Sequence, residues 1–328
     1  MNWSRKKVLV TGAGGFIGSH LVQFLMELGA DVRVFVRYTS SGNVGNLKFL
    51  SQCDELDFFY GDLKDPYAVR KALKDIDYVF HLAALISIPY SYLNPREYFE
   101  NNVKFILNIL QAIEDIGTEF VVHTSTSEVY GTAQYVPIDE KHPLTGQSPY
   151  SASKIAADKV VESFYLSYDS PVAILRPFNN FGPRQSFRAV IPTIIGQLLR
   201  GHDLRLGDIS TTRDFLYVKD TVRGFTRMVE KREITQGKTI NIGTGREVSI
   251  EKVANYLIAE INDKATILLD STKLRPKKSE VRRLCADISL AKEILDWKPV
   301  YSLEQGLKET IAWIKENFSL YTQDSDFK

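Results

Sequence analysis

The sequence predicts an α/β protein with a doubly wound parallel sheet, followed by a smaller α/β region. In the first half of the chain, short β-branched runs alternate with helical patterns. A glycine-rich turn follows the first of these runs, and the regular alternation ends near residue 177. Strands separated by helices need right-handed crossovers, which place helices on both faces of a parallel sheet.

The first half contains six expected strands and four expected helices. Gly29 ends the first helix, and Pro66 suits the first position of the second. The strands are expected at 6–11, 31–37, 56–63, 77–84, 120–127 and 171–177, and the helices at 16–29, 66–75, 95–115 and 150–168.

The second half is less regular and predicts a substrate-binding region. Helices are expected at 190–200, 219–231, 249–261, 288–294 and 303–317, and short strands near 204–206 and 239–242. We therefore divide the chain into a dinucleotide-binding domain, 1–177, and a substrate-binding region, 178–328, some of whose segments return to the first domain.

Composition excludes several classes of function. The 328 residues include 41 Lys and Arg against 40 Asp and Glu, a net charge of +1, so no nucleic-acid partner is expected. The five histidines show no ligand-like pairing, which argues against a metal site. No apolar run reaches about 18 residues, so no membrane span is expected. The two cysteines, Cys53 and Cys285, lie far apart, and a cytoplasmic location is expected.

The first expected strand runs directly into a glycine-rich turn. Gly12, Gly15 and Gly18 have the spacing G-x-x-G-x-x-G, and an amphipathic helical pattern follows them. Such glycines allow a tight turn, close approach of the backbone to a pyrophosphate, and close packing of helix on sheet. This context predicts a Rossmann-type NAD(P) site rather than a merely flexible turn.

The end of the second expected strand indicates which cofactor is bound. An acidic residue there would bind the adenosine ribose of NAD, whereas a cation would accept the 2′-phosphate of NADP. The chain has Arg37 followed by Tyr38, Thr39, Ser40 and Ser41, so NADP is expected and NAD is the alternative. The structural alternative to a phosphate contact is a solvated Arg37 that binds no ligand.

A pair of side chains with acid–base chemistry lies at 150–154. Tyr150 and Lys154 are four residues apart, so they share one face of a helix. A neighbouring lysine favours the phenolate and should lower the pKa of Tyr150. Thr126, at the end of the preceding strand, could hydrogen-bond a substrate oxygen that is being oxidised.

Motifs along the whole chain resemble the extended short-chain dehydrogenases/reductases that act on nucleotide sugars. In order, they are the glycine turn, FHLAA (80–84), TSTSEVYG (124–131), YSASK (150–154), RPFNNFGPR (176–184), TTRDFLYVKD (211–220), NIGTG (241–245) and LRP (274–276). The resemblance implies a tightly bound cofactor that is regenerated in each turnover. It assigns cofactor contacts to Phe16, Ile17, Asp62, Leu63, Leu82, Ala83, Ala84 and Pro177, in addition to the glycines, Arg37, Tyr150 and Lys154.

Glu128 separates the activities within this family. The 4,6-dehydratases carry a carboxylate at this position, and the 4-epimerases generally carry a small or hydroxyl residue. A 4-keto group acidifies the C5 proton, which Glu128 could remove. Ser127 stands where many glucose-type dehydratases have Asp, so Glu128 is expected to protonate the leaving hydroxyl as well. The structural alternative is that Glu128 only caps a helix.

Other activities remain open on the same scaffold. UDP-glucuronate decarboxylases share a Ser-Glu-Val-Tyr-Gly signature, and a 5,6-dehydratase would use the same residues. A 4-epimerase ranks below these because of Glu128. A non-enzymatic NADP sensor is disfavoured because Thr126, Glu128, Tyr150 and Lys154 are all present.

The resemblance is greatest to dehydratases of the legionaminic-acid and related nonulosonic-acid pathways. It implies UDP- or GDP-N-acetylglucosamine as substrate and the 4-keto-6-deoxy sugar as product. Asn179, Arg213 and Arg275 match residues that meet the diphosphate or ribose, and Arg184 is a further candidate for substrate binding. The helices at 95–115 and 150–168 match a pair that forms a homodimer interface.

Overall fold

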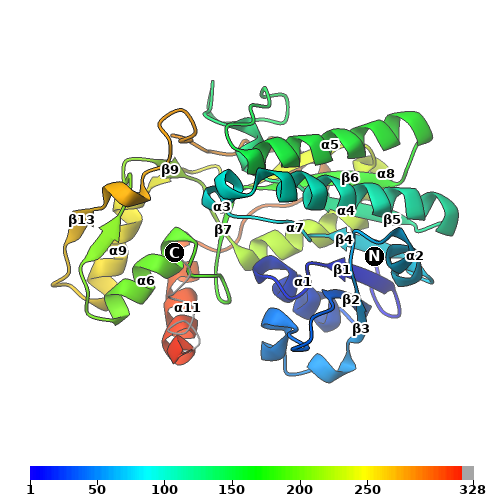
Figure 1. The fold of residues 1–328 in the computed structure, drawn as a ribbon, viewed down its shortest axis with the longest axis horizontal. Helices are drawn as coiled ribbons and strands as arrows, with labels where there is room; N and C mark the ends of the chain where they lie inside the picture. Colours follow the sequence, from blue (N-terminus) through cyan, green and yellow to red (C-terminus); the bar gives the residue numbers. More distant parts are fainter. Residues whose placement is uncertain (320–328) are drawn as a thin grey trace.

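A seven-stranded parallel sheet forms the centre of the computed structural model, which describes residues 1–319 (Figure 1). Its order is β11-β6-β5-β4-β1-β2-β3, and every neighbouring pair is parallel. The strands are β1 Lys7–Thr11, β2 Asp31–Arg37, β3 Asp57–Gly61, β4 Tyr78–His81, β5 Phe120–Thr124, β6 Val172–Pro177 and β11 Thr239–Ile242. The predicted Rossmann-type fold is confirmed.

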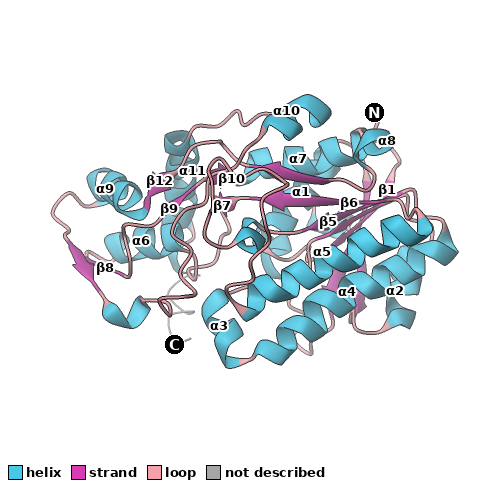
Figure 2. Cartoon of the chain, turned by 90° about the horizontal axis from the view of Figure 1, so that it is seen from above, coloured by secondary structure: helices cyan, strands magenta, loops and turns pink. Residues whose placement is uncertain are grey.

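Helices cover both faces of this sheet (Figure 2). One face carries α2 Pro66–Leu73, α4 Pro95–Ile116 and α5 Pro149–Tyr168, and the other carries α1 Phe16–Glu27 and α7 Val218–Glu230. The alternation of side chains along β1 divides the core in two. Val8 and Val10 pack in the cluster that includes Phe225 of α7, whereas Leu9 packs with Ile109 of α4.

The ends of α1 and α5 follow from local sequence. Helix α1 begins after Gly15, and the chain leaves it through Gly29, whose φ of +84° suits a residue without a Cβ. Helix α5 begins with a capping box, in which Ser148 and Ser151 each bind the other's backbone N–H. Pro149 follows at the first helical position. This well-defined start fixes the first turn of α5, which carries Tyr150.

The second region has its own apolar core. Ile194, Phe215, Leu257 and Leu307 are buried there together. Its helices are α6 Val190–Leu199, α9 Ile250–Ile261 and α11 Leu303–Glu316, and its paired strands are β7 Asn179–Phe181 with β10 Phe215–Tyr217, β8 Leu204–Leu206 with β13 Ile267–Leu269, and β9 Thr212–Arg213 with β12 Val248–Ser249. Short helical segments complete the fold at α3 Ile88–Leu93, α8 Arg232–Thr235, α10 Ser289–Leu295, η1 Gly45–Phe49, η2 Cys53–Glu55, η3 Ser127–Tyr130 and η4 Ser271–Lys273.

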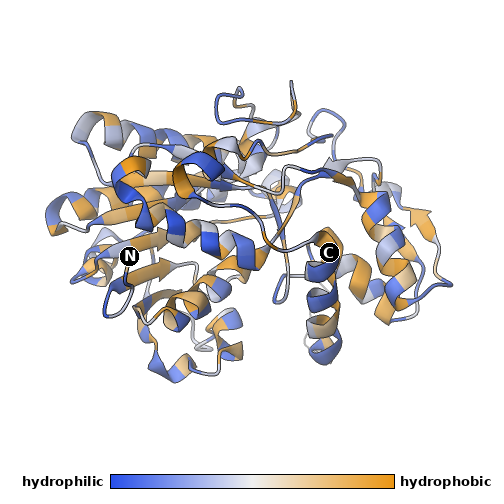
Figure 3. Ribbon diagram, turned by 180° about the vertical axis from the view of Figure 1, so that it is seen from behind, coloured by the Kyte–Doolittle hydropathy of each residue, from blue (hydrophilic) through white to orange (hydrophobic). Residues whose placement is uncertain are grey.

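The chain returns to the main sheet after it has entered the second region. Strand β11 pairs with β6, from Thr239 opposite Ile174 to Ile242 opposite Pro177. The segment 239–242 therefore belongs to the main sheet and not to the smaller region in which the sequence placed it. Figure 3 shows apolar residues concentrated along the central strands. Within residues 1–319, no helix combines the length and the apolar character needed to cross a membrane.

Asp214 joins three segments that are distant in sequence. Its carboxylate accepts hydrogen bonds from the backbone N–H of Thr244 (2.7 Å), Gly245 (2.9 Å) and Ala286 (3.1 Å). The residue is fully buried, and burial raises the pKa of its carboxyl group. The interaction holds the turn after β11 and the segment before α10 against Asp214, which lies between β9 and β10.

We expect Asp214→Ala to lower the free energy of unfolding by about 3 kcal/mol or more, because buried N–H groups lose their acceptor. Urea denaturation followed by circular dichroism measures this change. Asp203→Ala is the control, because exposed Asp203 also accepts from a backbone N–H, that of Thr266. Its cost should stay below about 1 kcal/mol. Equal losses in the two variants would contradict the role given to Asp214.

Candidate active site

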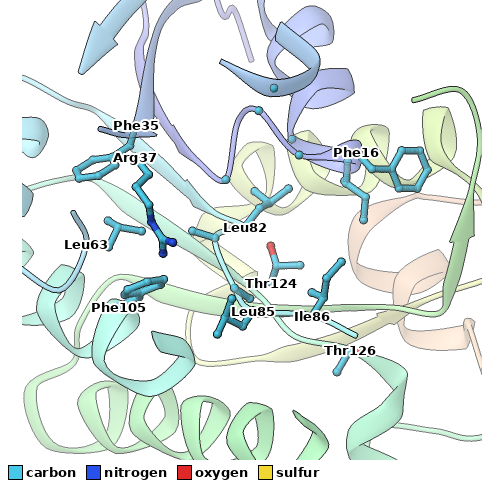
Figure 4. A pocket seen from close by; sticks show the side chains of 18 of the residues that line it. Phe16, Phe35, Arg37, Leu63, Leu82, Leu85, Ile86, Phe105, Thr124 and Thr126 are labelled. Carbon is cyan, nitrogen blue, oxygen red and sulfur yellow. The ribbon is translucent and has the colours of Figure 1, made fainter. Parts of the chain in front are cut away.

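A cavity of about 690 Å³ opens at the carboxyl ends of the central strands (Figure 4). Its walls come from the turn after β1, the ends of β2 and β3, the segments after β4, β5 and β6, and the start of α5. Parallel strands bring all their carboxyl ends to one edge of a sheet, where α/β proteins bind their ligands. The cavity contains both the predicted nucleotide site and the predicted catalytic residues.

The glycine turn forms one end of the cavity. Gly12 has a φ of +68°, and a Cβ on Gly18 would lie 2.2 Å from the Gly12 carbonyl oxygen. Only glycine allows this turn and this close packing of α1. The cavity is lined by Gly12, Gly15, Phe16, Ile17, Gly18, Arg37, Asp62, Leu63, Leu82, Ala83, Ala84 and Pro177. Every residue predicted to touch the cofactor therefore faces one cavity, which fits a dinucleotide.

Arg37 is the last residue of β2, and its side chain points into the cavity between Leu63 and Phe105 (Figure 4). Thr39 lines the same part of the cavity and shares a hydrogen bond of 3.2 Å with Ser41. A cation and hydroxyl groups therefore meet where a ribose or a 2′-phosphate would bind.

The residues after β5 place a carboxylate in the cavity. Thr126 caps η3, and its Oγ1 accepts a hydrogen bond of 3.2 Å from the Glu128 backbone N–H. The cap is therefore Thr126 rather than Glu128. Thr126, Ser127 and Glu128 all line the cavity with Tyr150.

Tyr150 behaves differently from the expectation for a tyrosine beside a lysine. Burial raises the pKa of Tyr150, a hydrogen bond with Thr126 opposes this, and the charge of Glu128 raises it further. The predicted lowering of this pKa by Lys154 is wrong for this structure. The Lys154 ammonium instead donates to the Thr124 carbonyl oxygen at 2.7 Å, and burial lowers its own pKa to about 8.

A buried ion pair lies beneath Lys154, one helical turn further along α5. Asp158 accepts hydrogen bonds from Arg176 Nε (3.1 Å) and Nη2 (2.9 Å), and from Ser125 Oγ (2.7 Å). Burial opposes ionisation of Asp158, but Arg176 and His123 hold its pKa at about 2. The pair connects α5 to β6 and keeps Lys154 at the floor of the cavity.

The structure separates the residues predicted to bind substrate. Asn179 lines the cavity, and its Oδ1 is buried without a hydrogen bond to the described residues. Arg213 and Arg275 lie together beyond Glu128, with Glu280 between them. Arg184 instead donates to Gln23 of α1 at 2.6 Å. None of the three arginines is among the residues that line the cavity, so Glu280 brings Arg213 and Arg275 together beside it, and Arg184 is held by a different partner.

Several lining residues were not predicted from the sequence. They are Gly14, Phe35, Val36, Asn43, Val44, Gly45, Gly61, Leu85, Ile86, Phe105, Thr124, Ser125, Phe178, Asn180 and Gln185. Some could have been found, because they adjoin predicted residues at strand ends. Others could not. Val44 and Gly45 lie at the glycine turn because the next residue, Asn46, donates a backbone hydrogen bond to the Gly14 carbonyl oxygen (2.9 Å), and Phe105 comes from the middle of α4.

Comparisons with known proteins identify the family. A family model described as "GDP-mannose 4,6 dehydratase" matches residues 9–310. The chain belongs to this family. Among its relatives, a putative UDP-glucose 4-epimerase of Methanocaldococcus jannaschii is 34% identical over 94% of this chain and 99% of its own. The mouse (Mus musculus) dTDP-D-glucose 4,6-dehydratase is 32% identical over 95% of this chain and 90% of its own.

A solved structure of a dehydratase resembles this protein over nearly the whole length of the chain. The dTDP-glucose 4,6-dehydratase DesIV from Streptomyces venezuelae, solved with NAD and TYD bound, has a TM-score of 0.87 and 30% identity. The match covers 97% of this chain and 99% of DesIV. This nucleotide-sugar dehydratase and epimerase family therefore accounts for the fold and for the cavity at the strand ends. Because DesIV holds NAD, the comparison does not support the NADP preference expected from Arg37.

Proposed function

We propose that this protein is a nucleotide-sugar 4,6-dehydratase that converts UDP- or GDP-N-acetylglucosamine to the 4-keto-6-deoxy sugar. The observation that carries the proposal is the position of Glu128, which lines the same cavity as Thr126 and Tyr150. A bound nicotinamide cofactor supplies the hydride acceptor for C4 and the hydride donor for C6. The remaining steps are proton transfers and are assigned to side chains of this chain.

Tyr150 takes the proton of the C4 hydroxyl, and Thr126 holds the same oxygen by a hydrogen bond. The resulting 4-keto group acidifies C5, and Glu128 removes the C5 proton. Because the hydroxyl of Ser127 is a poor acid, Glu128 passes this proton to the C6 hydroxyl, which leaves as water. The cofactor would return the hydride to C6, C5 would take a proton from solvent through Glu128, and Tyr150 would release the C4 hydroxyl proton to solvent, which balances the reaction as loss of one water. Lys154, held by the Thr124 carbonyl, places a positive charge on the cavity floor.

Glu128 favours dehydration over epimerisation, because a 4-epimerase leaves the C5 proton in place and needs no base there. Asn179, Arg213 and Arg275 would bind the diphosphate through charge-assisted and amide contacts.

Mass spectrometry of the purified enzyme incubated with UDP- and GDP-N-acetylglucosamine and UDP-glucuronate tests the proposal. Loss of water from an amino sugar would support it, and loss of carbon dioxide from UDP-glucuronate would overturn it. An unsaturated product would indicate a 5,6-dehydratase. We propose that the 4-keto-6-deoxy amino sugar is an intermediate of nonulosonic-acid synthesis.

Glu128→Gln should retain reduction of the bound cofactor by substrate, while product formation falls by about 10²–10⁴-fold, because the base for C5 is lost. Tyr150→Phe should instead abolish cofactor reduction itself. Nicotinamide absorbance and product mass, recorded on the same samples, separate the two steps. Unchanged turnover in Glu128→Gln would remove the C5-base assignment.

We also propose that the cofactor is NADP, held through its 2′-phosphate by Arg37 and Thr39. Arg37→Ala should weaken NADP binding about tenfold or more and leave NAD binding unchanged, because a charge-assisted contact is lost. Arg33→Ala is the matched control, since Arg33 lies on the same strand but pairs with Asp57 (2.6 Å). Calorimetric titration with both cofactors measures the difference. Tighter binding of NAD than of NADP by the wild type would contradict the proposal.

A homodimer is proposed to form through α4 and α5. Half-exposed or exposed apolar residues repeat at helical spacing along both helices, at Phe99, Val103 and Leu107 on α4 and at Ala152, Ala156 and Val160 on α5. Two copies of this helix pair can form a four-helix interface.

Leu107→Arg should raise the dimer dissociation constant by at least about tenfold, because a charge enters the buried centre of the interface. Sedimentation velocity at several concentrations measures the shift. Leu269→Arg, on exposed β13, is the control and should leave the assembly unchanged. A wild-type protein that is monomeric throughout would refute this assignment.

A further inference from the structure

Two arginines share a single carboxylate oxygen beside the candidate active site. Glu280 Oε1 lies 3.4 Å from Arg213 Nη2 and 3.7 Å from Arg275 Nη1. Arg213 Nη1 also donates to the Thr212 carbonyl oxygen at 2.9 Å, which fixes one side of its guanidinium. Glu280 therefore forms the bridge between the two cations.

The charges of this group are closely balanced. Arg213 is buried, and burial and the charge of Arg275 lower its pKa, while Glu128 and Glu280 raise it. Two arginines and two glutamates sum to zero, so removal of either carboxylate leaves a positive charge that is partly shielded from water. The Nη1 atom of Arg275 is buried and makes no hydrogen bond with the described residues. This guanidinium is thus positioned for an acceptor that Glu280 does not fully provide.

The backbone around Glu280 is fixed, whereas its carboxylate has only long contacts. Ser279 Oγ donates to the Gln147 carbonyl oxygen (2.5 Å) and shares a hydrogen bond with the Tyr92 hydroxyl (2.6 Å). Thr132 Oγ1 donates to the Glu280 carbonyl oxygen at 3.3 Å, and Gln147 Nε2 donates to that of Lys278 at 3.0 Å. The carboxylate can therefore leave the arginines by rotation of its own side chain, without movement of the segment that carries it.

We propose that Glu280 is a displaceable counter-ion, which neutralises Arg213 and Arg275 before substrate binds and gives way to the diphosphate of the nucleotide sugar. This inference rests on the proposed function, since it needs the two arginines to bind a diphosphate. A phosphate group provides several oxygens, so it can bind both guanidinium groups at shorter distances than one carboxylate oxygen does. Return of the carboxylate then assists release of the product.

The competition between Glu280 and the ligand predicts an unusual mutational effect. Glu280→Gln should bind UDP, GDP and inorganic pyrophosphate about three- to tenfold more tightly than the wild type, because a negative charge near the phosphates is removed. The same variant should melt at a lower temperature without ligand, since the arginines lose their counter-ion. Isothermal titration calorimetry and thermal unfolding measure the two effects.

Glu247→Gln is the matched control. Glu247 contacts Thr212 on the same strand as Arg213, but its ionic partner is Arg283, so anion binding should stay at the wild-type level. Glu280→Ala is the second variant and should also tighten binding of pyrophosphate, because it lacks the same charge. Weaker or unchanged binding in both Glu280 variants would overturn the proposal and make Glu280 a fixed anchor. Failure of the wild type to bind UDP, GDP and pyrophosphate would instead count against the proposed function.

Discussion

The parallel direction of the main strands is the constraint on which the site depends. Because β1, β2, β4, β5 and β6 all run the same way, residues separated by more than a hundred positions reach one edge of the sheet. The glycine turn, Arg37 and Glu128 each follow a different strand, yet they line one cavity. An antiparallel pairing of any one strand would carry its residues to the opposite edge. The strand order and direction therefore decide which side chains can meet in the cavity.

Charge is arranged in two layers around this edge. Beneath the cavity, Asp158 and Arg176 form a buried, hydrogen-bonded pair that fixes α5 against β6. Above this ion pair, at the floor of the cavity, lie Lys154 and Tyr150. Burial disfavours the charged form of both side chains. Their proton affinities therefore depend on what enters the cavity. The site is built so that ligands change its charge state, both at Tyr150 and at the cluster of Arg213, Arg275 and Glu280.

The sequence predicted those structural features that neighbouring residues determine, and missed those that depend on distant residues. Strand β2 and helices α4 and α5 carry long periodic patterns, and their ends were predicted to within one or two residues. The glycine turn and the Tyr150–Lys154 spacing likewise express their chemistry within a few residues. Strands β7, β9, β10 and β12 have only two or three residues and depend on distant partners. The direction of Arg184 follows from a backbone φ of +65°, and the pKa of Tyr150 follows from burial, neither of which the sequence expresses locally.

The position of β11 in the sequence, far after its partner β6, also affects how the chain can fold. Strand β6 is buried along its whole length, and its outer edge is covered only when residues 239–242 pair with it. A nascent chain that ends near residue 177 would present this apolar strand with unpaired N–H and C=O groups, which invites pairing with other chains. The part of the second region from β7 to β10, together with α7, is made between these two strands, so it must emerge before the sheet can close. Residues 1–177 alone therefore lack the strand that completes their sheet, and a fragment that ends there would need residues 239–242 to cover β6.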